Sequence, residues 1–184
     1  MSMIKRMAII VVSVIAVVFM AFTVVGWLWS GEFFFLAPSY SKMDRYLKAN
    51  IDELSYVADA LFELDYDSIT IHRNPRRVED KYDTTMQVSR EYLVYETIPI
   101  PDELLDHIVA LYESGVRYIS CGHDSVGFSI WAFMGDIRGI IYSRTGEKPD
   151  GGHIIEVRQL SKENWYYYVD NFEKWKARNP ELFQ

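Results

Sequence analysis

The most reactive-looking side chains in this sequence are in the run Cys121-Gly122-His123-Asp124. A thiolate nucleophile needs a base, and the base needs a carboxylate to orient it, so these residue types fit nucleophilic catalysis. Catalytic cysteine and histidine usually come from separate elements, however, whereas neighbours on one turn point in different directions. The run therefore favours an ordinary β-turn. A hydrolase that uses Cys121 or a histidine is the alternative function.

Side chains that bind metals in other proteins are scattered along this chain. The four histidines stand singly, without the short ligand spacings of a zinc site, at His72, His107, His123 and His153. The run Asp65-Tyr66-Asp67 lacks the glycine and the distal glutamate of a calcium loop. We therefore predict no metal and no other cofactor.

A basic spot is the first candidate for a binding surface. Arg73, Arg76 and Arg77 lie close together in an acidic domain, and such a spot suits anionic lipid or an acidic partner. Short charge clusters are more often solvated loops. The sequence therefore favours a solvated loop here, with a binding surface formed by the three arginines as the alternative.

The aromatic stretch from residue 165 to residue 175 is the second candidate, because rings stack on sugars and anchor peptides. Large rings also prefer burial, and we predict a terminal helix that covers the core. One face of that helix would collect the rings spaced by three, four and three residues, namely Trp165, Tyr168, Phe172 and Trp175. Tyr166 and Tyr167 would project to its sides and stay partly exposed. Of the aromatic residues in this stretch, these two tyrosines are therefore the better candidates for binding.

Hydrophobic periodicity predicts the elements that position these residues. Two amphipathic helices are expected, one running for about six turns from Ser41 and one from Pro101 to Gly115. The predicted strands span residues 67–73, 85–97, 117–120, 126–133, 139–143 and 154–160. Because the strands mostly follow one another with short connections, we predict an α+β fold with a mainly antiparallel sheet and two or three helices.

The beginning of the chain carries an apolar run, residues 7–29, that is long enough to cross a bilayer. Signal-peptide cores span only about 7 to 15 residues, and Trp27 and Trp29 replace a small-residue cleavage site, so we predict a retained signal anchor. Lys5 and Arg6 precede the run, and the positive-inside rule keeps them cytoplasmic. The prediction is a stub and anchor over residues 1–29, a linker over 30–40 and an extracytoplasmic domain over 41–184.

Charge excludes one class of partner. The part that follows the anchor carries 17 basic side chains (19 less Lys5 and Arg6) against 26 acidic ones, a net charge of −9. Nucleic acid repels such a domain, so no nucleic-acid partner is expected. The single cysteine excludes an internal disulfide.

The last third of the chain resembles a family of small uncharacterised bacterial proteins, some of them membrane-anchored. The residues that carry this resemblance are Gly139-Ile140-Ile141-Tyr142-Ser143, Pro149, Leu160, Trp165-Tyr166-Tyr167-Tyr168, Phe172 and Trp175. The resemblance implies a domain of its own and implies no activity.

These observations predict a single-pass membrane protein with a non-catalytic protein-interaction module outside the cytoplasm. One version is immunity against a toxin, because an acidic domain complements a basic toxin. Regulation of an envelope complex is another version. Membrane lipid around residues 7–29 and a protein outside the cytoplasm are the expected partners.

Overall fold

The computed structural model divides the chain into two compact units, Met1–Ala37 and Pro38–Gln184. The structure describes residues 37–73, 84–91, 94–133 and 135–183, together with Val12, Ser13, Ile15, Val17 and Val18. These five residues are helical and exposed. No helix in the described ranges is both long and apolar enough to span a membrane. The predicted anchor lies mostly outside the described residues and stays a prediction.

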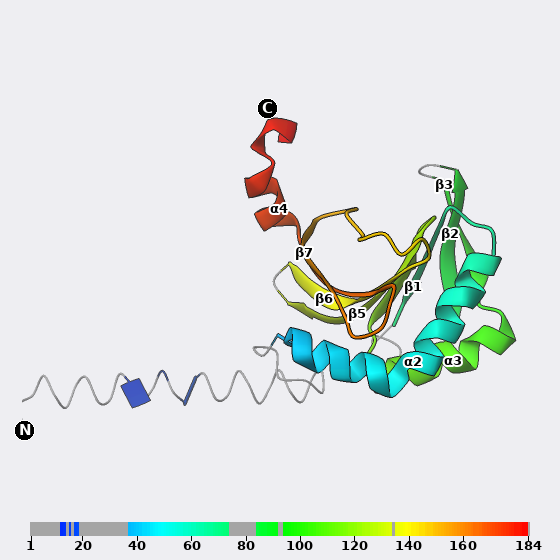
Figure 1. Cartoon of the computed structure of the whole chain (residues 1–184), viewed down its shortest axis with the longest axis horizontal. Helices are drawn as coiled ribbons and strands as arrows, with labels where there is room; N and C mark the ends of the chain where they lie inside the picture. Colours follow the sequence, from blue (N-terminus) through cyan, green and yellow to red (C-terminus); the bar gives the residue numbers. More distant parts are fainter. Residues whose placement is uncertain are drawn as a thin grey trace, which may run out of the picture. The chain divides into compact units, whose positions relative to one another are not determined.

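The second unit is built on one eight-stranded antiparallel sheet with the strand order β3-β2-β1-β4-β5-β6-β8-β7 (Figure 1). The strands are β1 (Ser68–His72), β2 (Thr85–Glu91), β3 (Val94–Pro99), β4 (Tyr118–Cys121), β5 (Ser125–Phe133), β6 (Asp136–Ser143), β7 (Ile154–Gln159) and β8 (Trp165–Asn171). The helices are α2 (Tyr40–Glu63), α3 (Asp102–Ser114) and α4 (Phe172–Arg178), followed by the 3-10 turn η1 (Pro180–Phe183). The predicted α+β class with a mainly antiparallel sheet is confirmed.

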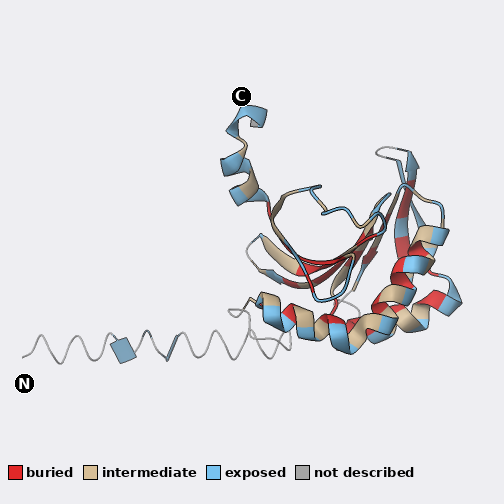
Figure 2. Ribbon diagram, viewed as in Figure 1, coloured by how far each residue is buried: buried red, intermediate tan, exposed pale blue. Residues whose placement is uncertain are grey.

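Helices α2 and α3 cover one face of the sheet, and the hydrophobic core lies between them and the strands. Their apolar side chains recur every three or four residues, so each helix has one apolar face. Figure 2 shows these buried stripes turned toward the sheet. The buried positions are Met43, Leu47, Leu54, Val57, Ala58 and Leu61 on α2 and Leu104, Ile108, Leu111 and Tyr112 on α3. Helix α3 ends at Gly115, whose φ of 118° is a left-handed conformation that suits glycine.

The start of α2 differs from the prediction. Ser39, not Ser41, is the N-cap, and its side chain accepts a hydrogen bond from the backbone N–H of Lys42. Asp44 serves another purpose, because its carboxylate accepts from the backbone N–H of Ser161 at 2.8 Å and from Lys48 Nζ at 2.6 Å. Hydrogen bonds from Lys48 and Ser161 lower the pKa of Asp44 to about 2. This carboxylate ties α2 to the turn between β7 and β8.

Two connections also differ from the prediction. The stretch predicted as one strand over residues 85–97 is a hairpin of β2 and β3, with an irregular register between Val88 and Glu91. The connection from β6 to β7 is not a tight turn, because β8 lies between these two strands. Residues 144–153 therefore pass over β8 to connect β6 with β7, and we call them the strap. The strap lies over the face opposite α2 and α3.

The aromatic segment near the carboxyl terminus is a strand and not the predicted helix. All rings from Trp165 to Tyr168 are buried in β8, which pairs with β6 on one side and β7 on the other. Trp165 and Tyr167 point to the helix-covered core. Tyr166 and Tyr168 point to the opposite face, where they pack with Ile141. Helix α4 follows and has no buried residue, so the predicted cover over the core does not exist.

Candidate functional site

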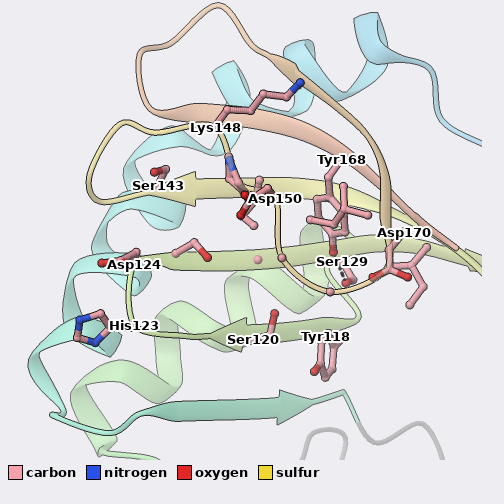
Figure 3. A pocket seen from close by; sticks show the side chains of 18 of the residues that line it. Tyr118, Ser120, His123, Asp124, Ser129, Ser143, Lys148, Asp150, Tyr168 and Asp170 are labelled. Carbon is pink, nitrogen blue, oxygen red and sulfur yellow. Dashed lines mark hydrogen bonds between the residues drawn. The ribbon is translucent and has the colours of Figure 1, made fainter. Parts of the chain in front are cut away.

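A groove lies on the face of the sheet that the helices leave open. Its volume is about 860 Å³, which falls within the range of ligand sites. Strands β1, β4, β5, β6 and β8 form the floor, and the strap forms one wall (Figure 3). The floor is lined mainly by hydroxyl groups, glycine and small apolar side chains: Tyr118, Ser120, Ser125, Gly127, Ser129, Ala132, Ile137, Ile141, Ser143 and Tyr168.

One row of paired residues forms the centre of the floor. Tyr118, Ser129, Gly139 and Tyr168 are successive partners across β4, β5, β6 and β8. The Tyr168 ring lies against Gly139, because a Cβ built there would be 2.9 Å from its Cε1 atom. The phenol oxygen of Tyr168 then reaches Ser129 Oγ at 2.7 Å, as the dashed line in Figure 3 shows. Burial raises the pKa of Tyr168, so this phenol stays neutral.

Hydrogen bonds attach the strap to the sheet at both ends. Near its start, Tyr166 Oη donates to the Gly146 carbonyl at 2.7 Å. Gly146 has a φ of 77°, and a side chain there would meet Asn164. At its end, the His153 carbonyl accepts from the backbone N–H of Asn171 at 3.0 Å. The strap is therefore held over the groove by strand β8 and by the turn before it.

Acidic side chains outnumber basic ones around the groove. Four carboxylates line it against two basic residues, namely Asp124, Glu147, Asp150 and Asp170 against Arg117 and Lys148. His72 and His123 line it as well. Burial raises the pKa of Asp170, an effect that nearby His153 offsets only in part. The groove is thus a region of negative potential, and the hydroxyl groups of its floor lie within a mainly apolar surface.

The run that looked reactive in the sequence is divided between two sides of the sheet. Cys121 is 4% exposed and belongs to the helix-covered core. Its thiol donates to the Gly122 carbonyl at 3.4 Å. His123 and Asp124 instead line the end of the groove. In the described part of the chain, neither His72 nor His123 hydrogen-bonds to a hydroxyl or thiol, so this geometry argues against a nucleophile and base pair.

We expect Cys121 to be unreactive in the folded protein. Burial raises the pKa of this thiol to about 12, so the thiolate that attacks an alkylating reagent is nearly absent at pH 8. Mass spectrometry should show slow carbamidomethylation by iodoacetamide in buffer and rapid modification in guanidinium chloride. Equal rates in the two conditions would mean that the thiol is accessible, and would restore Cys121 as a candidate nucleophile.

The predicted binding residues are not brought together. Tyr166 and Tyr167 are 6% and 3% exposed, so the prediction that they stay partly exposed is wrong. They also point to opposite faces of the sheet, because side chains alternate along a strand. Arg73 follows β1, and its backbone N–H donates to the Arg117 carbonyl. Arg76 and Arg77 lie outside the described residues.

The groove residues are not part of the charged and aromatic clusters that stand out in the sequence. Their signal was alternation: Tyr118 and Ser120 face the groove, whereas Ile119 and Cys121 face the core. Strand β5 continues the same alternation with Gly127 and Ser129. Polar residues at every second position of a central strand indicate that its second face is open.

Other candidate clusters are small. The described residues contain no group of three or more histidine, cysteine or acidic side chains placed to hold a metal ion. His107 Nδ1 lies 2.5 Å from Glu53 Oε2, and its ring stacks on Tyr56 at 3.8 Å between centroids. These contacts join α3 to α2, so His107 has a packing role.

Comparison with known proteins finds no matching family model, and no curated protein or solved structure with significant similarity. The fold and the site define an α+β protein with a strapped groove on the helix-free face of an antiparallel sheet. The resemblance to small bacterial proteins remains a prediction.

Proposed function

We propose that this chain is a single-pass membrane protein that presents a non-catalytic binding module outside the cytoplasm, and that the groove under the strap binds a segment of a partner protein. The observation that carries this proposal is the groove itself. One face of the sheet packs against the helices to form the core, while the other carries a groove about 860 Å³ in volume, with hydroxyl groups set in a mainly apolar floor.

The amino-terminal sequence supports the membrane part of the proposal. Residues 7–29 are uncharged and apolar over a length that spans a bilayer. Under the positive-inside rule, Lys5 and Arg6 favour a cytoplasmic amino terminus. An immunity protein that binds a toxin and a regulator of an envelope complex both fit this arrangement, because each needs a tethered domain with a specific docking site.

The placement of Cys121 supports binding over hydrolysis. A hydrolase of the cysteine type needs a thiol exposed to the substrate and a base within hydrogen-bond reach. Cys121 has neither, because it lies in the core and its hydrogen bond goes to a backbone carbonyl.

The test introduces one reactive thiol at a time into the full chain. His123→Cys places a thiol at the groove, and Asp59→Cys places one on the exposed side of α2. Cells with a permeabilised outer envelope are treated with a membrane-impermeant maleimide-benzophenone and then illuminated. We expect both thiols to be labelled and only the groove thiol to give a discrete protein adduct.

Each failure has its own meaning. If neither thiol reacts until the cells are lysed, the proposed orientation is wrong. If both thiols react and give the same adducts, or none, the groove is not the docking site. Native Cys121 should not react with the reagent, because it is buried.

A further inference from the structure

Three carboxylates are distributed along the groove, and we call Asp124, Asp150 and Asp170 the groove carboxylates. Asp124 lies in the turn before β5, Asp150 on the strap, and Asp170 near the opposite end of β8. Figure 3 shows Asp124 and Asp170 at the two ends with Asp150 between them. In the described residues, none of the three forms an ion pair with lysine or arginine, although His153 interacts with Asp170.

The basic residues of the groove do not neutralise these groups. Lys148 is exposed, and in Figure 3 its side chain runs away from Asp150. Glu147 is its immediate neighbour, so the charges of this pair offset each other. Arg117 is then one cation against the three groove carboxylates. The negative potential of the groove is therefore available to a ligand.

The length of the groove matches an extended peptide. Six residues of β6 separate Ser143 at one end from Ile137 at the other, which is about 20 Å at 3.3 Å per residue. An extended chain of about six residues has the same length, and alternate side chains along it point to the same side. A ligand of this shape can place several side chains along one groove.

We propose that the groove binds an extended segment of a partner protein that carries lysine or arginine side chains, and that the groove carboxylates receive those side chains. This inference rests on the proposed function and names the chemistry of the partner. The hydrogen-bonded Ser129 and Tyr168 hydroxyls provide polar groups in the floor beneath the segment. Half-burial of Asp170 strengthens its attraction for a cation, because solvent screens it less.

The probe is an eight-residue peptide of alternating lysine and serine with a fluorescein label, tested by fluorescence anisotropy against the full chain in detergent buffer. A peptide of alternating glutamate and serine is the reversed-charge control. We expect saturable binding of the lysine peptide only. Replacing all three groove carboxylates by asparagine should weaken the binding about tenfold, as expected for three ion pairs in contact with solvent.

A matched variant distinguishes binding in the groove from attraction to the net negative charge of the domain. Asp52, Asp59 and Asp106 are exposed on α2 and α3. Replacing these three by asparagine changes the net charge by the same amount, and should alter the dissociation constant less than twofold. If both triple variants weaken binding equally, or the lysine peptide does not bind, the inference is overturned. The single change Asp150→Asn lies on the exposed strap and should weaken binding about twofold. This variant tests the inference even if the triple variant does not fold.

Competition by spermine tests whether the groove prefers a peptide to a small polyamine cation. We expect spermine to compete at least tenfold more weakly than the unlabelled lysine peptide, because it lacks a backbone to lie on the floor. Equal competition would assign the groove to a small polyamine and overturn the inference. Discrete adducts from the groove thiol together with no binding of the lysine peptide would overturn this inference and leave the proposed function standing.

Discussion

Trp165→Ala is expected to lower the free energy of unfolding by about 3 to 5 kcal/mol, the usual cost of removing a buried tryptophan side chain. Trp165 is 4% exposed and points from β8 into the helix-covered core. Its ring contacts Tyr142 at 4.9 Å and Phe128 at 6.0 Å between centroids. The fragment from Pro38 to Gln184 contains the whole core, so urea unfolding of this fragment measures the loss.

Trp175→Ala is the matched control, because it removes the same side chain from a site outside the core. Trp175 is only partly buried on α4, where it contacts His153 at 5.1 Å between ring centroids. We expect a loss of about 1 kcal/mol or less, as is usual away from the core. Equal losses in the two variants would mean that α4 packs on the core, as the sequence alone suggested.

Gly139→Ala is expected to have the second largest effect, about 3 kcal/mol or more, at the upper end of the cost of overpacking. A Cβ at this position would lie 2.1 Å from the Phe128 carbonyl oxygen and 2.9 Å from Tyr168 Cε1. The carbonyl belongs to the backbone of β5 and cannot move without separating β5 from β6. Both the sheet and the contact between Tyr168 and Ser129 should be disturbed.

Gly122→Ala is the control for the lost flexibility of glycine. A Cβ at residue 122 would meet nothing within 4 Å, so we expect a change within about 0.5 kcal/mol. Thermal unfolding followed by near-ultraviolet circular dichroism reports both stability and the environment of the tyrosines. If Gly139→Ala keeps the parent midpoint and the parent tyrosine signal, the close packing of Tyr168 on Gly139 is refuted.

The long helices and the short strands were predictable because the apolar residues of each element recur with one dominant period. Leu54, Val57 and Leu61 repeat at the spacing of a helix face, and Ile69 and Ile71 repeat at the spacing of a strand face. The pairing of β6 with β8 was not predictable, because nothing local in residues 144–153 indicates that the connection crosses a strand.

The aromatic stretch shows why periodicity failed at the carboxyl terminus. Every ring from Trp165 to Tyr168 is apolar enough for burial, so the stretch has no polar position to mark an alternation. A strand that is buried on both faces has this pattern, and only its β-branched and aromatic composition separates it from a helix. Strand β8 is buried on both faces because the strap covers the second one.

The candidate site was predictable only in part. His123 and Asp124 were singled out from the sequence and do line the groove, but Cys121 does not. Ser129 and Tyr168 are 39 residues apart in the chain, and only the register of β5, β6 and β8 brings their hydroxyls together. Such a pair is set by the tertiary fold and has no signature of its own.

The alternation of side chains along β4 and β5 has a consequence for how sequences of this fold can diverge. A substitution at Ser120 would change the lining of the groove without disturbing Ile119, because the two side chains point to opposite faces of one strand. Selection on binding and selection on folding therefore act on different positions of the same short segment. Homologues would be expected to keep the odd-numbered core positions of β4 while Tyr118 and Ser120 vary with the partner.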